Sequence, residues 1–312
     1  MKVIVTGCGG DIGQSIGKIL LKINFIKKIY GCDISDKNAG IFIYKNFFKS
    51  IPCDDKRYLK FLENVIISKN INIIIPISEP ELRFFTKNRI TQIGNAKILA
   101  PSYLARNVGF DKYKTIEYLK KFNLPYPKTN LLKDNEYKIN FPFIIKSRIG
   151  SGSSKVHTIN NTLQHNLLKP SLNNNYIIQE FIKGKDNEYT CGLFRSKNGE
   201  IRTIIIKRKL SGGFTVYGEI VENKKIVKIL EKLAFNLNLI GSINIQLKIY
   251  KNVPLIFEIN PRFSSTVRFR DLLGFKDLEW CLNDLLNKPI ENYNNNNVIG
   301  KKIYKGYNEY IK

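Results

Sequence analysis

The sequence is poor in histidine and lacks closely paired cysteines. Among its 312 residues the only histidines are His157 and His165, both in a polar region. A histidine-based catalytic triad or a histidine-rich metal centre is therefore nearly excluded, so the chemistry must rest on Lys, Arg, Glu, Asp, Asn and Gln. The five cysteines are widely spaced and form no C-x-x-C pair. This argues against a disulfide framework and favours a reducing, cytoplasmic location.

Long apolar runs and runs of basic residues are also missing. No apolar segment approaches the roughly 18 residues of a membrane-spanning helix, and Met1 leads directly into the strand-like stretch VIVTG. We therefore expect neither a membrane span nor a signal peptide. The formal net charge is +25, but no five Lys or Arg residues follow one another. We expect no specific nucleic-acid partner, although the charge would attract acidic ligands.

The hydrophobic pattern predicts an α/β domain at the N-terminus. Three short apolar strands, KVIVTG, KKIYGCD and INIIIPIS, are separated by helix-like segments at residues 11–25 and 55–70. Strands that alternate with helices form a parallel sheet covered on both faces. We therefore predict a Rossmann-like domain over residues 1–100.

The pattern changes near residue 100. Helical segments interrupted by Pro125 and Pro127 lead to a strand at FPFIIKSR, a small-residue loop at IGSGSS and a strand at YIIQEFI. From Glu188 onward the sequence predicts hairpins of the α+β type, with turns at Asn198-Gly199 and Lys251-Asn252. We predict further domains over residues 101–187 and 188–312.

A glycine-rich turn follows the first strand. TGCGGDIG places Gly7, Gly10 and Gly13 where backbone amides can hold an anion, and Asp33 ends the second strand, where a ribose-binding carboxylate would lie. One hypothesis is therefore an NAD(P)-dependent nucleotide-sugar oxidoreductase or epimerase. Such enzymes need a Tyr with a Lys four residues later, and none of the 16 tyrosines has one. Close packing of helix on strand would by itself explain the glycines.

Polar residues alternate in LIFEINPRFSST, residues 255–266. On an extended strand Glu258, Asn260 and Arg262 share one face, and Phe257, Ile259 and Phe263 share the other. Oxygen ligands followed by a cation suit a metal that carries phosphate groups. The alternative is an edge strand with a solvated polar face that ends at Pro261.

The order of these motifs resembles the ATP-grasp superfamily, most closely its carbamoyl-phosphate-synthase-like branch with a preceding Rossmann-like domain. Lys112, Lys146, the glycine-rich loop, QEFI, Glu188, NIQLKI and FEINPR follow one another as in that family. The resemblance covers nearly the whole chain. It implies that residues 101–187 form the N-lobe, or lid, with its preceding helical segments, and that residues 188–312 form the C-lobe.

The resemblance also implies an ATP site. The lysines would contact the α and β phosphates, the loop of residues 149–155 would close over the triphosphate, the QEFI strand would hold adenine, and an acid would take the ribose. In this order the residues are Lys112 and Lys146; Ser151, Gly152 and Ser153; Glu180, Phe181 and Ile182; and Glu188.

For the metal and the reaction, the resemblance implies that Gln246, Glu258 and Asn260 bind Mg²⁺ or Mn²⁺ and that Arg262 stabilises the transferred phosphoryl group. The implied function is an ATP- and Mg²⁺-dependent ligase that joins a small carboxylate to an amine through an acyl phosphate and releases ADP and phosphate. A basic nucleic-acid-binding protein is a lesser alternative, because the sequence shows no aromatic-plus-basic binding module.

The binding of the two substrates is less defined by the sequence. IKRKLSGG carries Lys207, Arg208 and Lys209, of which the forked Arg208 best suits a carboxylate or acyl phosphate, although a solvated basic strand is the alternative. The stretch PISEPELRFF offers a wall that would face an amine, formed by Ser78, Glu79 and Glu81. A homodimer is the default expectation for the assembly.

Overall fold

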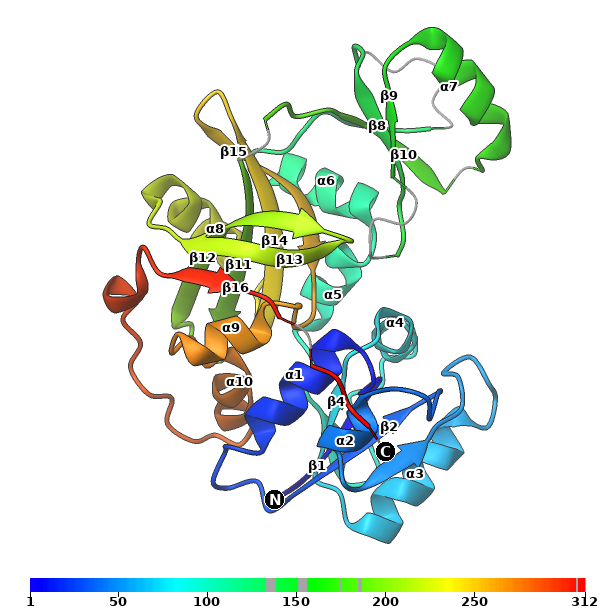
Figure 1. Ribbon diagram of the computed structural model, residues 1–312, viewed down its shortest axis with the longest axis vertical. Helices are drawn as coiled ribbons and strands as arrows, with labels where there is room; N and C mark the ends of the chain where they lie inside the picture. Colours follow the sequence, from blue (N-terminus) through cyan, green and yellow to red (C-terminus); the bar gives the residue numbers. More distant parts are fainter. Residues whose placement is uncertain (133–138, 151–155, 174, 185–186, 307, 312) are drawn as a thin grey trace.

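The computed structural model describes residues 1–132, 139–150, 156–173, 175–184, 187–306 and 308–311. Its strands form three sheets, which lie along the molecule from the N-terminal domain to a small outlying unit (Figure 1). Within the described part of the chain, no helix is long and apolar enough to cross a membrane. The expected parallel sheet at the N-terminus is present, whereas the domain limits remain a prediction.

The N-terminal sheet has the order β3-β2-β1-β4-β6-β5 and is parallel except for its last strand, β5. Its strands are β1 (Lys2–Thr6), β2 (Lys28–Asp33), β3 (Phe47–Lys49), β4 (Ile73–Pro76), β5 (Gln92–Ile93) and β6 (Ala96–Ile98). Its helices are α1 (Asp11–Leu20), α2 (Gly40–Ile43), α3 (Tyr58–Lys69) and α4 (Glu79–Lys87). The short elements β3, β5, β6, α2 and α4 were not expected from the sequence.

Both faces of this sheet are buried, as in other parallel sheets. Val3 and Val5 on β1 belong to one hydrophobic core, and Ile4 between them belongs to another. The core of Val3 and Val5 continues into the C-terminal part of the chain, where it includes Phe275 and Trp280. The N-terminal domain and the C-lobe therefore share one core rather than meeting through a wet interface.

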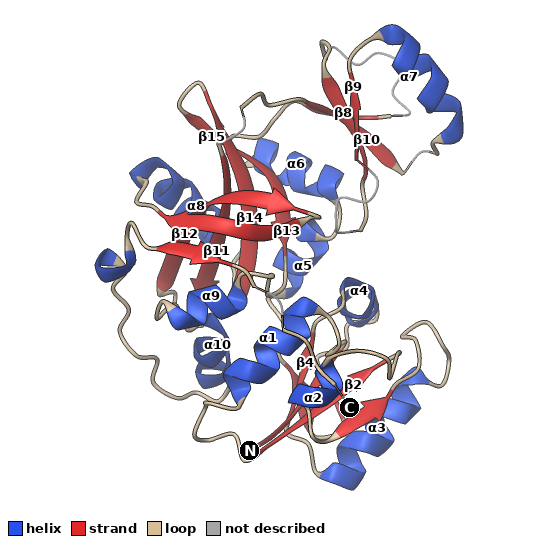
Figure 2. Cartoon of the chain, viewed as in Figure 1, coloured by secondary structure: helices blue, strands red, loops and turns tan. Residues whose placement is uncertain are grey.

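A four-stranded sheet forms the lid, which is the outlying unit in Figure 2. Its order is β7-β10-β8-β9, and its elements are β7 (Thr129–Leu131), β8 (Phe143–Ser147), β9 (Val156–Ile159), α7 (Thr162–Leu168), η1 (Lys169–Ser171) and β10 (Tyr176–Glu180). Two helices precede it, α5 (Tyr103–Gly109) and α6 (Lys112–Lys121). The sequence predicted a strand over YIIQEFI, residues 176–182. The observed strand β10 ends at Glu180, so Phe181 and Ile182 lie just after the strand.

The C-lobe is a six-stranded antiparallel sheet with the order β15-β14-β11-β12-β13-β16. Its elements are β11 (Glu188–Arg195), β12 (Ile201–Ser211), β13 (Phe214–Ile220), α8 (Lys224–Asn236), β14 (Gly241–Tyr250), β15 (Val253–Asn260), α9 (Val267–Leu272), α10 (Asp277–Leu285), η2 (Asn296–Val298) and β16 (Lys302–Tyr304). Both expected hairpins are present. Lys251 and Asn252 have φ of 46° and 64°, as a tight primed turn requires.

Glu81 lies inside the N-terminal domain, although the sequence suggested that it faces a substrate amine. Its side chain is 3% exposed and accepts hydrogen bonds from the hydroxyls of Thr6, at 2.5 Å, and Tyr58. Helix periodicity explains the error, because Glu79 and Glu81 are two residues apart on α4 and so point to different sides. Burial raises the pKa of Glu81 to about 7.

We expect Glu81 to make the protein less stable as the pH rises. The pKa of Glu81 in the folded protein is raised above its ordinary value. Its contribution to the free energy of unfolding is therefore complete below pH 4.5 and is lost as the pH rises through about 7. Glu81→Gln removes this titration. The unfolding free energy of the variant, relative to wild type, should therefore increase by up to about 3 kcal/mol between pH 4.5 and pH 8.

Urea unfolding over this pH range measures the difference. Glu222→Gln, on an exposed side chain, is the matched control and should give the same difference from wild type at every pH. A pH-independent difference for Glu81→Gln would contradict the assigned titration.

Candidate active site

A cavity of about 610 Å³ lies between the lid and the C-lobe. Its wall brings together most of the residues singled out in the sequence, from both sides of the molecule: Lys112, Lys146, Glu180, Ile182, Glu188, Arg208, Gln246, Glu258, Asn260 and Arg262. Phe181 is not part of the described wall. Ser151, Gly152 and Ser153 lie outside the described residues. The rest of the set therefore converges on one cleft.

The pairing of β14 with β15 places the oxygen ligands. Gln246 lies opposite Glu258, and Asn244 lies opposite Asn260. The register shifts between Gln246 and Leu247, so Phe257 is an extra residue on β15. The strict alternation expected from the sequence is therefore wrong at this point, because a β-bulge turns Phe257 to the cleft beside Glu258.

Lys146 stands at the end of β8 with its side chain turned into the cleft. It is 6% exposed, and its Nζ lies 5.3 Å from the centre of the Phe257 ring. Burial lowers the pKa of the Lys146 ammonium to about 8, and the charge of Glu258 only partly offsets this effect. A desolvated cation in an apolar setting gains more from a bound anion than a solvated one does.

Lys112 is the first residue of α6 and lies beside Gly150, near the start of the glycine-rich loop. Its Nζ donates to the carbonyl of Gly150 at 2.7 Å. Asp111 caps α6 by accepting from the backbone N–H of Tyr113 at 2.9 Å, and it pairs with Arg148 at 2.6 Å. This arrangement joins Arg148 and Gly150, just before the part of the loop that lies outside the described residues, to the helix that carries Lys112.

Arg208 bridges two residues that the sequence assigned to different roles. Its guanidinium donates to Glu188 Oε1 at 2.8 Å and to Gln246 Oε1 at 2.9 Å. Lys248, which the sequence did not single out, lies 3.7 Å from the other Glu188 oxygen. Gln246 Oε1 therefore already accepts one hydrogen bond, from Arg208, and keeps a second lone pair, whereas Glu258 and Asn260 make no hydrogen bond to any described side chain.

These oxygens fit a hard divalent cation. Mg²⁺ takes oxygen ligands, keeps several waters and is commonly shared with nucleotide phosphates, so one carboxylate with amide oxygens suffices. A site made by protein carboxylates and imidazoles alone does not fit, because the described part of the chain contains no cluster of three His, Cys, Asp or Glu residues. Glu258 and Asn260, with Gln246 as a third oxygen, would hold the metal.

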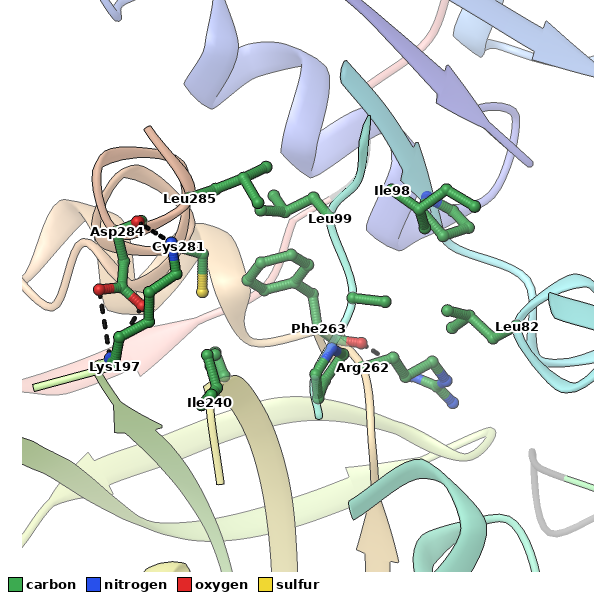
Figure 3. Close-up of a pocket in the computed structure, with 15 residues that line it drawn as sticks. Leu82, Ile98, Leu99, Lys197, Ile240, Arg262, Phe263, Cys281, Asp284 and Leu285 are labelled. Carbon is green, nitrogen blue, oxygen red and sulfur yellow. Dashed lines mark hydrogen bonds between the residues drawn. The ribbon is translucent and has the colours of Figure 1, made fainter. Parts of the chain in front are cut away.

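Arg262 lies where the cleft meets a second, smaller cavity of about 60 Å³ between the N-terminal domain and the C-lobe (Figure 3). Its guanidinium points away from the Lys197 and Asp284 end of this cavity. Burial lowers the pKa of Arg262, and the charges of Glu79 and Glu258 oppose this effect. The cavity is otherwise mainly apolar, with Phe263 at its centre.

The segment that contains most of the cleft residues matches a known protein family. Residues 110–266 match the model of the ATP-grasp domain. The chain belongs to the ATP-grasp family. This ATP-grasp chain is 26% identical, over 294 residues, to an uncharacterized protein of Methanocaldococcus jannaschii, which covers 87% of this chain and 74% of that protein.

Other relatives share shorter segments with this ATP-grasp chain. It is 26% identical over 208 residues to the carbamoyl phosphate synthase large chain of Thermoanaerobacter pseudethanolicus, covering 58% of this chain but 18% of the relative. It is 30% identical over 143 residues to the coenzyme gamma-F420-2:alpha-L-glutamate ligase of Methanocaldococcus jannaschii, covering 40% and 47%. This chain therefore spans less than half of each of these two relatives.

Solved structures show the same fold, so the expected Rossmann-like sheet followed by a two-lobed ATP-grasp fold is confirmed. The N5-carboxyaminoimidazole synthetase of Staphylococcus aureus, complexed with ADP, superimposes with a TM-score of 0.74 at 16% identity, covering 93% of this chain and 78% of that one. The biotin carboxylase domain of the Hydrogenobacter thermophilus 2-oxoglutarate carboxylase gives 0.73 at 12% identity, covering 96% and 72%.

Sequence patterns did not identify several residues of the ATP-grasp cleft. Lys248 and Asn244 stand two residues on either side of Gln246 on β14, so strand alternation could have found both. Ile12 and Phe214 also line the cleft, but they come from α1 and β13. Only the long-range packing of the chain brings those elements to this place, and no local pattern signals it.

In the glycine-rich turn of the N-terminal domain, Gly9 and Gly13 pack closely against other residues, whereas a Cβ at Gly10 would meet nothing within 4 Å. Asp33 accepts a hydrogen bond from the Gly9 N–H at 2.9 Å. A Cβ at Gly9 would lie 2.4 Å from Asn38 Cγ, and one at Gly13 would lie 2.6 Å from Cys8 Cα. These contacts support close packing as the reason for Gly9 and Gly13, and the oxidoreductase alternative is not favoured.

We expect nucleotide affinity to depend on the charge of Lys146. Above pH 8 the free protein loses this proton, so the affinity for ADP should fall by up to about tenfold per pH unit. Lys146→Arg keeps its charge over this range, and its affinity should be independent of pH. Calorimetric titration with ADP and Mg²⁺ from pH 6.5 to 9.5 measures the profile.

The control is Lys120→Arg, on an exposed side chain of α6, which should retain the wild-type profile. A wild-type affinity that stays constant above pH 8 would show that Lys146 does not supply the charge.

Proposed function

We propose that the protein is an ATP- and Mg²⁺-dependent ligase that joins a small-molecule carboxylate to an amine and releases ADP and phosphate. The observation that carries the proposal is the single cleft in which Lys112 and Lys146 of the N-lobe face the oxygen pair of Glu258 and Asn260. A nucleoside triphosphate requires cations for its phosphates, and its metal requires oxygen ligands on the other side.

In the proposed reaction the substrate carboxylate attacks the γ-phosphorus of ATP, and the bond to ADP breaks. The amine then attacks the carbonyl carbon of the acyl phosphate, phosphate leaves, and the amine proton passes to solvent. Mg²⁺ held by Glu258 and Asn260 would neutralise the phosphate oxygens. Lys146 orients the phosphates, Glu188 binds the ribose, and Arg262 compensates the charge that develops on the transferred group.

The names of the relatives support this class of reaction. A carbamoyl phosphate synthase chain and a glutamate ligase are among them, and the fold neighbours include structures with ADP. The neighbour with ADP, magnesium and bicarbonate indicates that small carboxylates belong in a first substrate screen. The exact carboxylate and amine are not carried over from these proteins.

We expect Glu258→Gln to abolish the effect of Mg²⁺ on nucleotide binding. The neutral amide attracts the metal less than the carboxylate does, so the affinity for a non-hydrolysable ATP analogue with Mg²⁺ should fall by about tenfold or more. Isothermal titration with and without Mg²⁺ gives the comparison. Glu231→Gln, on an exposed side chain of α8, should bind as wild type does.

ADP release then tests the ligase activity. Panels of small carboxylates and amines are offered with ATP and Mg²⁺, and the pair that accelerates ADP release identifies the reaction. A protein that binds NAD(P) but neither ATP nor ADP would overturn the proposal, as would an undiminished Mg²⁺ effect in Glu258→Gln.

A further inference from the structure

A buried arginine lies behind the floor of the cleft. Arg270, on α9, is 0% exposed and is the largest fully buried side chain of the described residues. It pairs with Asp277, which is 1% exposed, at 2.7 Å. A buried ion pair adds little net stability over an apolar pair of similar size, because both charges lose their hydration. The contacts of Arg270 therefore call for a reason other than stability alone.

Those contacts lead to the cleft. The Arg270 Nη1 group donates to Ser264 Oγ at 3.0 Å, to Thr266 Oγ1 at 3.1 Å and to Asn244 Oδ1 at 3.4 Å. Ser264 and Asn244 both line the cleft, and Asn244 lies opposite the expected metal ligand Asn260. One guanidinium thus ties β14 to the loop that follows β15, which also carries Arg262.

The same bonds determine how the Asn244 amide is turned. Its Oδ1 also accepts from the Thr190 hydroxyl at 2.9 Å, so the oxygen is committed to two buried donors. The Asn244 Nδ2 group makes no hydrogen bond to any described residue, and Asn244 lines the cleft. A hydrogen-bond donor beside the metal ligands favours an anionic oxygen at that point.

The sheet beneath leaves room for this side chain. A Cβ at Gly192, on β11, would lie 2.7 Å from Arg270 Cδ. Only glycine lets the guanidinium reach Asn244 in this position. The packing of β11 and the contacts of Arg270 therefore depend on each other.

We propose that Arg270 is a positioning residue that holds Asn244 and the loop of residues 262–266 in the arrangement that accepts the γ-phosphate of ATP. It does not touch the nucleotide, since it is fully buried. The inference rests on the proposed function, because it assigns the γ-phosphate to this end of the cleft. Arg270 would thereby give the protein a higher affinity for a nucleoside triphosphate than for the diphosphate.

The experiment measures the affinity of wild type and Arg270→Lys for ADP and for a non-hydrolysable ATP analogue, both with Mg²⁺. A lysine keeps the charge beside Asp277 but cannot span the same acceptors. The ADP affinity should stay within about twofold of wild type, while the preference for the triphosphate should fall about tenfold, the value of one charge-assisted hydrogen bond. A purely structural role would change both affinities alike.

Two further variants keep the test decisive. Thr266→Val removes one acceptor without leaving a buried charge, and it should lower the triphosphate preference about threefold if Arg270→Lys does not fold. Arg202→Lys is the matched control, since Arg202 is a buried arginine of the same lobe that lies over the Trp280 ring and pairs with Glu200. It should keep the wild-type preference.

The outcomes separate the two proposals. A wild-type protein that binds neither nucleotide overturns the proposed function. A wild-type protein that prefers the triphosphate, with Arg270→Lys and Thr266→Val retaining that preference or losing both affinities equally, overturns only the role of Arg270.

Discussion

The pairing of β14 with β15 is the constraint on which the cleft depends. Ile245 and Ile259 lie opposite each other and are fully buried beneath the sheet. Because alternate strand residues face opposite sides, this buried pair fixes the register and turns Glu258 and Asn260 to the cleft. A slip by one residue would bury the polar set and expose the apolar one. The hydrophobic core thus determines where a metal and its phosphates can lie.

The buried cations in the cleft and behind it differ in how their burial is compensated. Arg208 pairs with Glu188, and Arg270 pairs with Asp277. For Lys146, no described carboxylate oxygen lies within ion-pair distance, and the aromatic ring of Phe257 is its near neighbour. Burying a cation without an anion costs free energy, which the lowered pKa of Lys146 expresses. Of these three cations, Lys146 therefore gains most when a phosphate arrives.

Local patterns in the sequence predicted much of the fold, because strand alternation and turn residues are local properties, whereas most residues of the candidate site came from the order of motifs that resembles the ATP-grasp family. The hairpin at Lys251-Asn252 and the strand that carries Glu258 followed from them. The bulge at Phe257 did not, since it depends on the pairing partner. Glu81 was misplaced because the periodicity of α4 turns it away from Glu79, toward partners, Thr6 and Tyr58, that are distant in the sequence. The Arg270 and Asp277 pair has no sequence signal either, since charged residues on helices are normally exposed.

The shared core gives the N-terminal domain a role in the cleft that does not involve its glycine-rich turn. Phe263 follows Arg262 directly and belongs to the core that also contains Val3, Val5 and Trp280. The position of Arg262 is therefore determined partly by packing against the N-terminal sheet, since Arg262 and Phe263 share the wall of the smaller cavity. Close-packed interiors transmit displacement rather than absorb it. A change in how the N-terminal domain packs would consequently move the cation at the phosphoryl end of the cleft without any contact with the nucleotide.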